Sequence, residues 1–560
     1  MDMVKKLYQA TGKTILLGNL AIIRGALEAG VQFVSVYPGT PASEIGDTFS
    51  LLSKAGKKDF YFEYSTNEKV AMEAGIGASY SNLKTLVAMK HFGLNVASDA
   101  LLPFVYTGSK GPTVIIVADD PSCHSSGQSE ENSRAFGELA HIPILEPSDS
   151  QECKDFTKLA FEISEKFNIP VMIRTTTRVA HQSSIVNLGQ IKEPNREAKF
   201  VKDYKKFVTM PPRVLEMHKE LLEKIEKIRK LSENSKTNKI IGISKNVRTK
   251  DKVGIITSGV SHLYVMEALN KLKLEIPVLK LGFFYPLPEQ KISKFIKTLD
   301  KVLIVEELEP YLEKETMILA KDANPKLKIL GKSVLPQVRE LRPEFVTLAV
   351  AKLVNKKFSL GKAKLPSSPK RFPNLCPGCP YWFVFNGVKQ AIKESGLRKE
   401  DIIFGGGIGC YMLASFAPHE IQDYLLCMGS SIGVAHGIKK SSPKQKLITF
   451  IGDSSFFHAG IPALVNAVHN ESNPLIIVMD NKTAAMTGHQ PYPGIEKTGR
   501  GEKGPKVKIE KVIKACGVDN LEIINQVKDY SGFIKAVKRF LKEDKLTVII
   551  ARSPCLRIKK

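Results

Sequence analysis

The stretch that decides the fold is residues 447–494, LITFIGDSSFFHAGIPALVNAVHNESNPLIIVMDNKTAAMTGHQPYPG. An apolar run at 447–451 leads into Gly452-Asp453-Ser454. A helix-compatible segment follows, and a second apolar run at 475–479 leads into Asp480-Asn481. This order predicts a strand–helix–strand unit of an open parallel sheet, in which ligands bind beyond the carboxyl ends of the strands.

The polar residues at these two strand ends suit a metal-bound phosphate. Asp453 and Asn481 offer the oxygen ligands that Mg²⁺ takes when a phosphate completes its shell. Gly452 would let the turn bend tightly and let a diphosphate approach the backbone. An ordinary strand–helix–strand turn carries the same dipeptides, so these residues alone leave both interpretations open.

A longer run of residues identifies a family. The Gly-Asp-Ser turn with Asp-Asn about 25 residues later resembles the diphosphate and metal motif of thiamine diphosphate enzymes. The following run, NKTAAMTGHQP at 481–491, is similar to the large (alpha) subunit of indolepyruvate ferredoxin oxidoreductase, within the 2-oxoacid:ferredoxin oxidoreductase superfamily. The resemblance implies that Mg²⁺ is held on thiamine diphosphate by Asp453, Asn481 and the backbone oxygen of Thr483. It also implies cofactor-binding roles for Gly452, Ser454 and Thr487.

The composition is that of a globular chain with two to four domains: 560 residues, 43% hydrophobic and 25% charged. Apolar runs such as 114–118 and 548–551 are too short to cross a membrane and suit strands buried on both faces. Residues 1–14 lack the apolar core of a signal peptide. We therefore expect a cytoplasmic protein without a membrane partner.

The net charge of +25 raises the question of nucleic-acid binding. The lysines are spread over 199–252, 352–370 and 497–514, without interleaved aromatic residues or a recognised nucleic-acid motif. A solvated, lysine-rich surface is therefore favoured, and we expect no nucleic-acid partner. Docking of an acidic electron carrier is a further interpretation, because opposite fields steer encounter. Composition does not separate these two.

The chain divides into five predicted parts, and the fold class is α/β. Strands are expected at 33–37, 86–89, 113–117 and 171–173. The resemblance implies a thiamine diphosphate-binding fold with two doubly wound parallel-sheet modules, for pyrimidine and diphosphate, and a transketolase C-terminal-like domain. The predicted boundaries are a pyrimidine module (1–194), a helical connector (195–252), the transketolase-like domain (253–354), a Lys/Pro/Ser-rich linker (355–372) and the diphosphate module (373–560).

Glu68 opens a helix-compatible segment rich in Ala and Gly. An acidic residue in a first turn most often complements the helix dipole. In the superfamily, however, the Glu that hydrogen-bonds the aminopyrimidine ring lies nine residues before a Gly, as Glu68 does before Gly77. The resemblance thus implies this role for Glu68, with Glu73 in reserve. The run YPGTPASE at 37–44 also matches the family, which implies that Thr40 lies near the substrate carboxylate.

His489 is a candidate proton carrier, because imidazole titrates near neutral pH. A lone histidine is more often structural, so the sequence leaves its role open. The run that contains His489 is part of the stretch similar to the alpha subunit.

Four of the eight cysteines form a separate hypothesis. In a cytosolic chain we expect reduced thiols or metal ligands instead of disulfides. Cys376 and Cys379 form a CxxC pair, which suits a redox pair or half a zinc site. Cys410 and Cys555 each follow a predicted strand, 402–404 and 546–551. Resemblance to the pyruvate-oxidising relatives implies that these four hold a 4Fe-4S cluster; a Cys₄ zinc site and small buried residues are the alternatives.

Three features depart from the family pattern. The indolepyruvate group usually carries a C-terminal ferredoxin domain with two clusters, whereas this sequence ends five residues after Cys555. We therefore expect that electron relay to be absent or to lie on another polypeptide. Tyr381 stands where the family usually has His, and Gly407 where it has Asp.

The resemblance implies oxidative decarboxylation of an aryl 2-oxoacid, such as indolepyruvate, with coenzyme A. The expected products are an aryl-acetyl-CoA, CO₂ and reduced ferredoxin, with a smaller gamma-type subunit as partner in a heterodimer or α₂β₂ assembly. A non-oxidative thiamine-dependent decarboxylase or synthase is the alternative enzyme and needs no cluster. A basic scaffold or nucleic-acid-binding protein on an inactive thiamine fold is the alternative class, and the intact Asp453 and Asn481 motifs argue against it.

Overall fold

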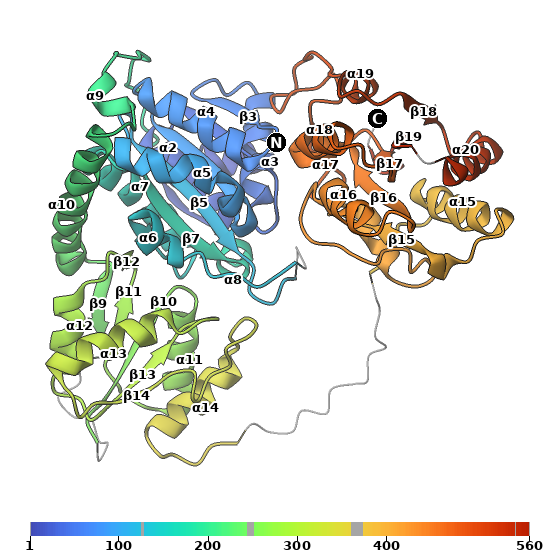
Figure 1. Ribbon diagram of the computed structural model, residues 1–560. Coiled ribbons are helices and arrows are strands. Elements are labelled where there is room, and N and C mark those ends of the chain that lie inside the picture. The colour runs from blue at the N-terminus through green and yellow to red at the C-terminus, as the bar shows by residue number, and fades with distance from the viewer. Residues whose placement is uncertain (1, 125–127, 243–250, 360–372, 544, 559–560) are drawn as a thin grey trace. The chain divides into compact units, whose positions relative to one another are not determined.

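The computed structural model describes residues 2–124, 128–242, 251–359, 373–543 and 545–558 (Figure 1). The chain forms two compact units, residues 1–364 and 365–560. Both are built on parallel sheets with helical connections, as the predicted α/β fold class requires. Among the described residues, no helix is both long enough and apolar enough to traverse a bilayer. The five-part division of the chain stays a prediction.

The first unit contains a seven-stranded sheet in the order β12-β6-β7-β5-β4-β2-β3. Its strands run parallel except for β12 at one edge. A strand forms at each of the four apolar runs that predicted one. Strand β5 is buried along its whole length because helices cover both faces of the sheet. The strands are β2 (Phe33–Val36), β3 (Tyr61–Tyr64), β4 (Thr85–Lys90), β5 (Thr113–Asp119), β6 (Ile144–Leu145), β7 (Val171–Thr176) and β12 (Phe283–Tyr285).

Two helices begin at the carboxyl edge of this sheet. Helix α4 (Glu68–Tyr80) follows β3, and the Asn67 side chain caps it by accepting a hydrogen bond from the Val70 amide at 2.8 Å. Helix α5 (His91–Thr107) follows β4 directly. The other described elements of this part are α1 (Asp2–Leu7), β1 (Gly12–Leu17), α2 (Gly18–Ala29), α3 (Ser43–Lys54), α6 (Ala135–Ala140), α7 (Ser150–Phe167), α8 (Thr177–His181), β8 (Ser183–Leu188) and α9 (Tyr204–Phe207).

The long helix α10 (Arg213–Asn234) connects the first sheet to a second one in the same unit (Figure 1). Leu221, Ile225 and Ile228 lie on one buried face of this helix, and α10 contacts both α5 and α12. The second sheet has the order β14-β13-β10-β11-β9. Its elements are β9 (Asn238–Ile241), β10 (Val253–Ser258), α11 (Ser261–Leu272), β11 (Val278–Leu281), α12 (Glu289–Ile296), β13 (Lys301–Val305), α13 (Tyr311–Ala323), β14 (Lys328–Leu330) and α14 (Pro343–Leu353).

A buried ion-pair network joins the two sheets of the first unit. The Arg134 guanidinium donates to Glu146 at 2.7 Å and to Glu306 at 2.9 Å. Arg174 donates to Asp119 at 2.7 Å and to Glu146 at 3.2 Å. Burial disfavours the charged form of Glu146, but the two arginines outweigh it and lower its pKa to about 2. The network therefore holds the two sheets together through paired charges.

The second unit carries one fully parallel sheet in the order β15-β16-β17-β19-β18. The helical segment expected after Gly452 begins directly at Asp453 and contains a π-helical turn, Phe456–Gly460, between α17 and α18. The elements are α15 (Tyr381–Glu394), β15 (Ile402–Gly405), α16 (Ser431–Ser441), β16 (Lys446–Gly452), α17 (Asp453–Ser455), α18 (Ile461–His469), β17 (Leu475–Asp480), α19 (Ile509–Ala515), β18 (Asn520–Ile524), α20 (Tyr530–Lys542) and β19 (Thr547–Arg552).

Candidate active site

The two motifs of the opening stretch meet at one edge of the second unit's sheet. Strands β16 and β17 are neighbours in parallel register, with Gly452 opposite Met479. Asp453 and Asn481 therefore follow adjacent strand ends, and both are buried. Gly452 has φ of −71°, which any residue adopts, so the bend itself does not require glycine. A Cβ there would lie 3.0 Å from the Tyr411 ring, so close packing is the reason for glycine.

Asp453 is fully hydrogen-bonded in its buried position. Its carboxylate accepts from the Ser454 amide at 2.8 Å, the Lys482 amide at 2.9 Å and the Tyr492 hydroxyl at 2.7 Å. Burial, followed by the negative charge of Asp480, raises the pKa of Asp453. The charged form of Asp453 is therefore costly unless a cation compensates it.

Asp480 is the second buried carboxylate of this edge. One of its oxygens accepts from the Lys482 ammonium and from the Arg552 guanidinium, each at 2.6 Å. Its Oδ1 is buried and has no hydrogen-bond partner among the described residues. Asp453 and Asp480 are thus neighbouring buried carboxylates, and the Asp480 Oδ1 has no described hydrogen-bond partner. This arrangement fits a divalent cation, because a cation would relieve the repulsion between the two carboxylates.

Asn481 and Thr483 complete the predicted magnesium set. The Asn481 side-chain oxygen accepts from the Thr483 amide at 3.2 Å, and both residues are buried. This set consists of one carboxylate, one amide oxygen and one backbone oxygen. Within the described ranges, no group of three or more His, Cys, Asp and Glu side chains is arranged to hold a metal ion.

The loop after Thr483 is held by its own hydrogen bonds. The Thr487 hydroxyl donates to the Gln490 side chain at 2.6 Å, and that side chain donates back to the Thr487 carbonyl at 2.7 Å. The His489 amide bonds to the Ala484 carbonyl at 2.9 Å. The His489 Nδ1 is buried without a hydrogen-bond partner in the described part of the chain, so it could hold or accept a proton.

The four predicted cysteine ligands, here called the cysteine group, influence one another electrostatically, although in the described part of the chain no set of three or more His, Cys, Asp and Glu side chains is arranged to hold a metal ion. Cys410 lies in a 3₁₀ turn after β15, and Cys555 lies just after β19. The Cys379 amide bonds to the Cys376 carbonyl at 3.0 Å, which closes the CxxC turn. Burial, and after it the other three thiols of the group, raise the pKa of Cys410 to about 12. The four side chains are thus within electrostatic reach of one another, and none is in a disulfide.

This cysteine group borders the Asp453 edge. The Cys555 amide bonds to the Asn481 carbonyl at 3.0 Å, and the Tyr381 hydroxyl bonds to the Met479 carbonyl at 3.1 Å. Burial raises the pKa of Tyr381 well above its usual range, with Asp453 and Cys410 acting in the same direction. Tyr381, the departure from the family's histidine, therefore lies between the carboxylate edge and the thiols.

The second departure, Gly407, also has a local explanation. A Cβ at Gly407 would lie 2.8 Å from the Tyr411 hydroxyl oxygen. Tyr411 is almost completely buried and also packs on Gly452. An aspartate at position 407 would therefore displace Tyr411 from this edge.

In the first unit, Glu68 lies buried in the first turn of α4. It packs against Gly93 in the first turn of α5, where a Cβ would lie 2.5 Å from the Glu68 Cγ. The reserve candidate Glu73 is 50% exposed and lies 4.0 Å from Lys69. Burial therefore favours Glu68 of the two, and Gly77 has open space where its Cβ would be.

Thr40 ends the turn that follows β2. Its hydroxyl oxygen lies 3.3 Å from the Ser43 hydroxyl oxygen, at the start of α3. Glu68 and Thr40 belong to the same sheet edge, because β2 and β3 are adjacent and parallel. Asp453 belongs to the other unit, so a shared site between Glu68 and Asp453 stays a prediction.

The sequence missed several residues of these edges. Tyr492 reaches Asp453 across 39 positions, and Arg552 reaches Asp480 across 72. No local pattern signals such contacts. Asp480 did carry a signal, because it ends the apolar strand next to Asn481.

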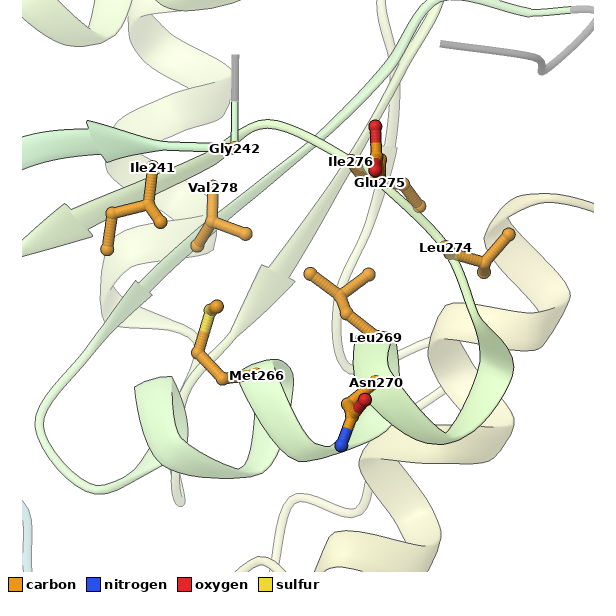
Figure 2. Close-up of a pocket in the computed structure, with 9 residues that line it drawn as sticks. All are labelled: Ile241, Gly242, Met266, Leu269, Asn270, Leu274, Glu275, Ile276 and Val278. Carbon is orange, nitrogen blue, oxygen red and sulfur yellow. The ribbon is translucent and has the colours of Figure 1, made fainter. Parts of the chain in front are cut away.

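A separate pocket of about 440 Å³ lies in the second sheet region of the first unit (Figure 2). Its lining is mainly aliphatic, with Met266 and Leu269 of α11 facing Ile241 and Val278 of the sheet. None of the predicted site residues lines it. The predicted site residues lie elsewhere, with Glu68 and Thr40 at the carboxyl edge of the first unit's large sheet and Asp453 and Asn481 at that of the second unit's sheet.

A sheet edge with Gly-Asp-Ser and Asp-Asn at neighbouring strand ends suits a thiamine diphosphate-binding enzyme, and two family models that match this chain agree with it. Residues 407–551 match the C-terminal TPP-binding domain of thiamine pyrophosphate enzymes. Residues 24–239 match the thiamine diphosphate-binding domain of pyruvate flavodoxin/ferredoxin oxidoreductases. Thiamine diphosphate is thus the cofactor of this chain's class.

Near full-length relatives define the family more narrowly. Indolepyruvate oxidoreductase subunit IorA of Methanothermobacter thermautotrophicus is 42% identical over 97% of this chain and 87% of its own length. The subunits of Archaeoglobus fulgidus and Thermococcus kodakarensis are each 40% identical over 97% of this chain and 86% of their own length. The chain belongs to the indolepyruvate oxidoreductase IorA family, within the 2-oxoacid:ferredoxin oxidoreductase superfamily. It is a thiamine diphosphate-dependent 2-oxoacid oxidoreductase.

Proposed function

We propose that this chain oxidatively decarboxylates aryl 2-oxoacids such as indolepyruvate, with coenzyme A as acyl acceptor and ferredoxin as electron acceptor. The names of the relatives support the indolepyruvate substrate. They are also named as subunits, which supports a smaller gamma-type partner for this chain. The observation that carries the proposal is the buried Asp453 and Asp480 pair beside Asn481, in a chain of this family.

In this proposal the second unit binds the diphosphate end of the cofactor. Asp453, the Asn481 side chain and the Thr483 backbone oxygen hold Mg²⁺ on the diphosphate. Gly452 and Ser454 form the turn that the diphosphate approaches, and Thr487 shapes the loop through its bonds with Gln490. The unpartnered Asp480 oxygen supplies negative charge beside the cation.

The first unit supplies the residues that act on the ring and the substrate. Glu68 hydrogen-bonds the aminopyrimidine and favours its imino tautomer, and Thr40 contacts the substrate carboxylate. His489, which belongs to the second unit, is the proposed proton carrier. Thiamine diphosphate supplies the nucleophile and the electron sink for decarboxylation when it is bound.

The cysteine group is the proposed electron exit. Cys376, Cys379, Cys410 and Cys555 are the residue type and number that a 4Fe-4S cluster takes. Their closeness to Asn481 through the Cys555 amide supports short-range electron transfer from the cofactor. Burial raises the pKa of Cys379 to about 11 and that of Cys410 to about 12, so these two thiols are protonated in the absence of a metal. Cluster binding would therefore release protons.

The test is anaerobic co-expression with a candidate small subunit, followed by measurement of iron, sulfide, thiamine and dye reduction. Indolepyruvate, phenylpyruvate and pyruvate are compared as substrates, with and without coenzyme A. We expect dye reduction that requires coenzyme A and is fastest with an aryl substrate. Turnover to an aldehyde without dye reduction, in a protein free of iron, would replace the proposal with a non-oxidative decarboxylase.

Cys555→Ser tests the cluster separately. It should remove iron, whereas Cys516→Ser should not, because Cys516 is a similarly half-buried thiol outside the group. Iron content equal to the parent protein in Cys555→Ser would rule out the proposed ligand set. A zinc content of one per chain with no iron would indicate a Cys₄ zinc site instead.

A further inference from the structure

Lys90 is a cation built into the carboxyl edge of the first sheet. It is the last residue of β4, which lies between β2 and β5. Its aliphatic stem crosses Gly39, where a Cβ would lie 2.9 Å from the Lys90 Cγ and 3.0 Å from its Cδ. A larger residue at position 39 would therefore push the stem away, and glycine keeps Lys90 beside the turn that carries Thr40.

The ammonium group of Lys90 lies among negative charges. It is 4.9 Å from the centre of the Phe92 ring. Burial lowers the pKa of Lys90, and the charges of Glu68, Asp120 and Glu131 act in the opposite direction. The same cation therefore faces Glu68 and stands next to the Thr40 turn.

The neighbouring carboxyl groups have fixed places of their own. Asp120 accepts from the Thr177 hydroxyl at 2.7 Å, and Glu131 accepts from the Asn95 amide at 3.0 Å. Glu68 is packed against Gly93. These contacts hold the acidic groups in position.

A 2-oxoacid adds a further negative charge to this edge. Three carboxyl groups already act on Lys90, so the substrate would be repelled unless a cation is present. A lysine ammonium is a compact point charge with three donors, which suits a carboxylate. We propose that Lys90 binds the carboxylate of the 2-oxoacid substrate, next to Thr40. The inference rests on the proposed function and adds a specificity-determining residue to it.

A structural role for Lys90 makes a different prediction. If Lys90 only balanced the charge of Glu68, its removal would affect every ligand of the site and the cofactor alike. A carboxylate-binding lysine affects only ligands that carry the carboxylate. Decarboxylation removes that group as CO₂, so a 2-oxoacid and the corresponding aldehyde are a matched pair of ligands.

The experiment uses the full chain, loaded with thiamine diphosphate and magnesium under anaerobic conditions. Lys90→Met, Lys90→Arg and the parent protein are compared. Lys69→Met is the control, because Lys69 follows Glu68 on α4 but is 41% exposed and paired with Asp99. The measurements are KM and kcat for indolepyruvate, equilibrium binding of indoleacetaldehyde, and the dissociation constant of thiamine diphosphate.

We expect Lys90→Met to raise KM for indolepyruvate about 10- to 100-fold, as for loss of a charge-assisted hydrogen bond. Lys90→Arg should recover part of this loss. Binding of the aldehyde and of thiamine diphosphate should stay within about 2-fold of the parent, and Lys69→Met should change nothing. An unchanged KM in Lys90→Met, or equal losses for the 2-oxoacid and the aldehyde, would overturn the inference.

The two possible failures are distinct. If the parent protein neither binds nor turns over any 2-oxoacid, the proposed function fails, and the inference fails with it because there is no carboxylate to bind. If the parent protein turns over indolepyruvate and Lys90→Met does so with the same KM, only the inference fails.

Discussion

Two buried charge clusters in this chain differ in how completely they are paired. In the first unit, both Arg134 and Arg174 form ion pairs with Glu146, and these pairs lower the pKa of Glu146 to about 2. In the second unit, Asp453 and Asp480 lie together, the pKa of Asp453 rises, and an oxygen of Asp480 has no described partner. The first cluster joins the two sheets of one unit through its ion pairs. In the second, Lys482 and Arg552 pair with one oxygen of Asp480, whereas the contacts of Asp453 are with neutral donors, so this edge fits a cation site.

The largest expected effect concerns the carboxylate that acts on the cofactor ring. Glu68→Gln should lower kcat about 10²- to 10⁴-fold, the usual contribution of a positioned acid–base group. Thiamine diphosphate binding should remain, since the diphosphate is held by the other unit. Steady-state kinetics and cofactor titration measure both. Glu73→Gln, on the exposed face of the same helix, is the control, and an equal loss there would contradict the assignment.

Loss of an arginine from the buried ion-pair network of Arg134 and Arg174 should lower the stability of the fold. Arg134→Met leaves Glu146 and Glu306 without their main partner, so we expect the free energy of unfolding to fall by about 3–5 kcal/mol. Arg500→Met breaks an exposed pair with Glu502 and should cost about 1 kcal/mol or less. Denaturant unfolding compares the two. Similar losses in both variants would mean that the network does not hold the two sheets together.

The interface between the two sheets of the first unit should also make the stability of the fold depend on pH. Burial raises the pKa of Glu307 from 4.5 to about 7. Between these values the folded state binds the proton and the unfolded state does not, so stability falls as pH rises from about 4.5 to 7. Glu307→Gln should flatten this slope by up to about 3 kcal/mol across the window. Unfolding at several pH values tests it, and an unchanged slope would contradict the account.

The smallest expected effect concerns the hydrogen bond between Tyr492 and Asp453. Tyr492→Phe removes one hydrogen bond from Asp453, worth about 1 kcal/mol. Because an outer contact orients a metal ligand, we expect the magnesium affinity of the cofactor complex to fall about 10-fold. Magnesium titration of cofactor binding measures it. Tyr530→Phe, at the start of α20, is the control. If Tyr492→Phe binds magnesium as tightly as the parent does, the Tyr492 hydroxyl does not orient Asp453.

The sequence predicted the parts of the site that are local. Asp453 and Asn481 each follow an apolar run, so strand periodicity places them at one sheet edge. Cys410 and Cys555 likewise follow predicted strands, and Cys376 and Cys379 form a short turn. The four thiols act on one another electrostatically, and their role as cluster ligands stays a prediction. The positions of these residues follow from the alignment of carboxyl ends in parallel sheets, and their binding roles stay predictions.

Contacts between distant segments were beyond such reasoning. The run at 283–285 was expected within the middle module, yet it pairs as β12 with β6 at the edge of the first sheet. Lys90 lies over Gly39 because β2 and β4 are neighbours, which no spacing in the sequence reveals. Tyr492 and Arg552 reach their carboxylates from other loops and strands. Strand order and side-chain packing decide these contacts, and both depend on the whole fold.

Asp453 is proposed to hold a metal ion that binds the diphosphate of thiamine diphosphate. The most direct measurement is a titration of thiamine diphosphate into the parent protein and into Asp453→Asn, with and without magnesium. We predict magnesium-dependent binding to the parent and a loss of at least about 100-fold in affinity for Asp453→Asn, more than for removal of an outer contact. Equal, magnesium-independent binding to both proteins would contradict the account.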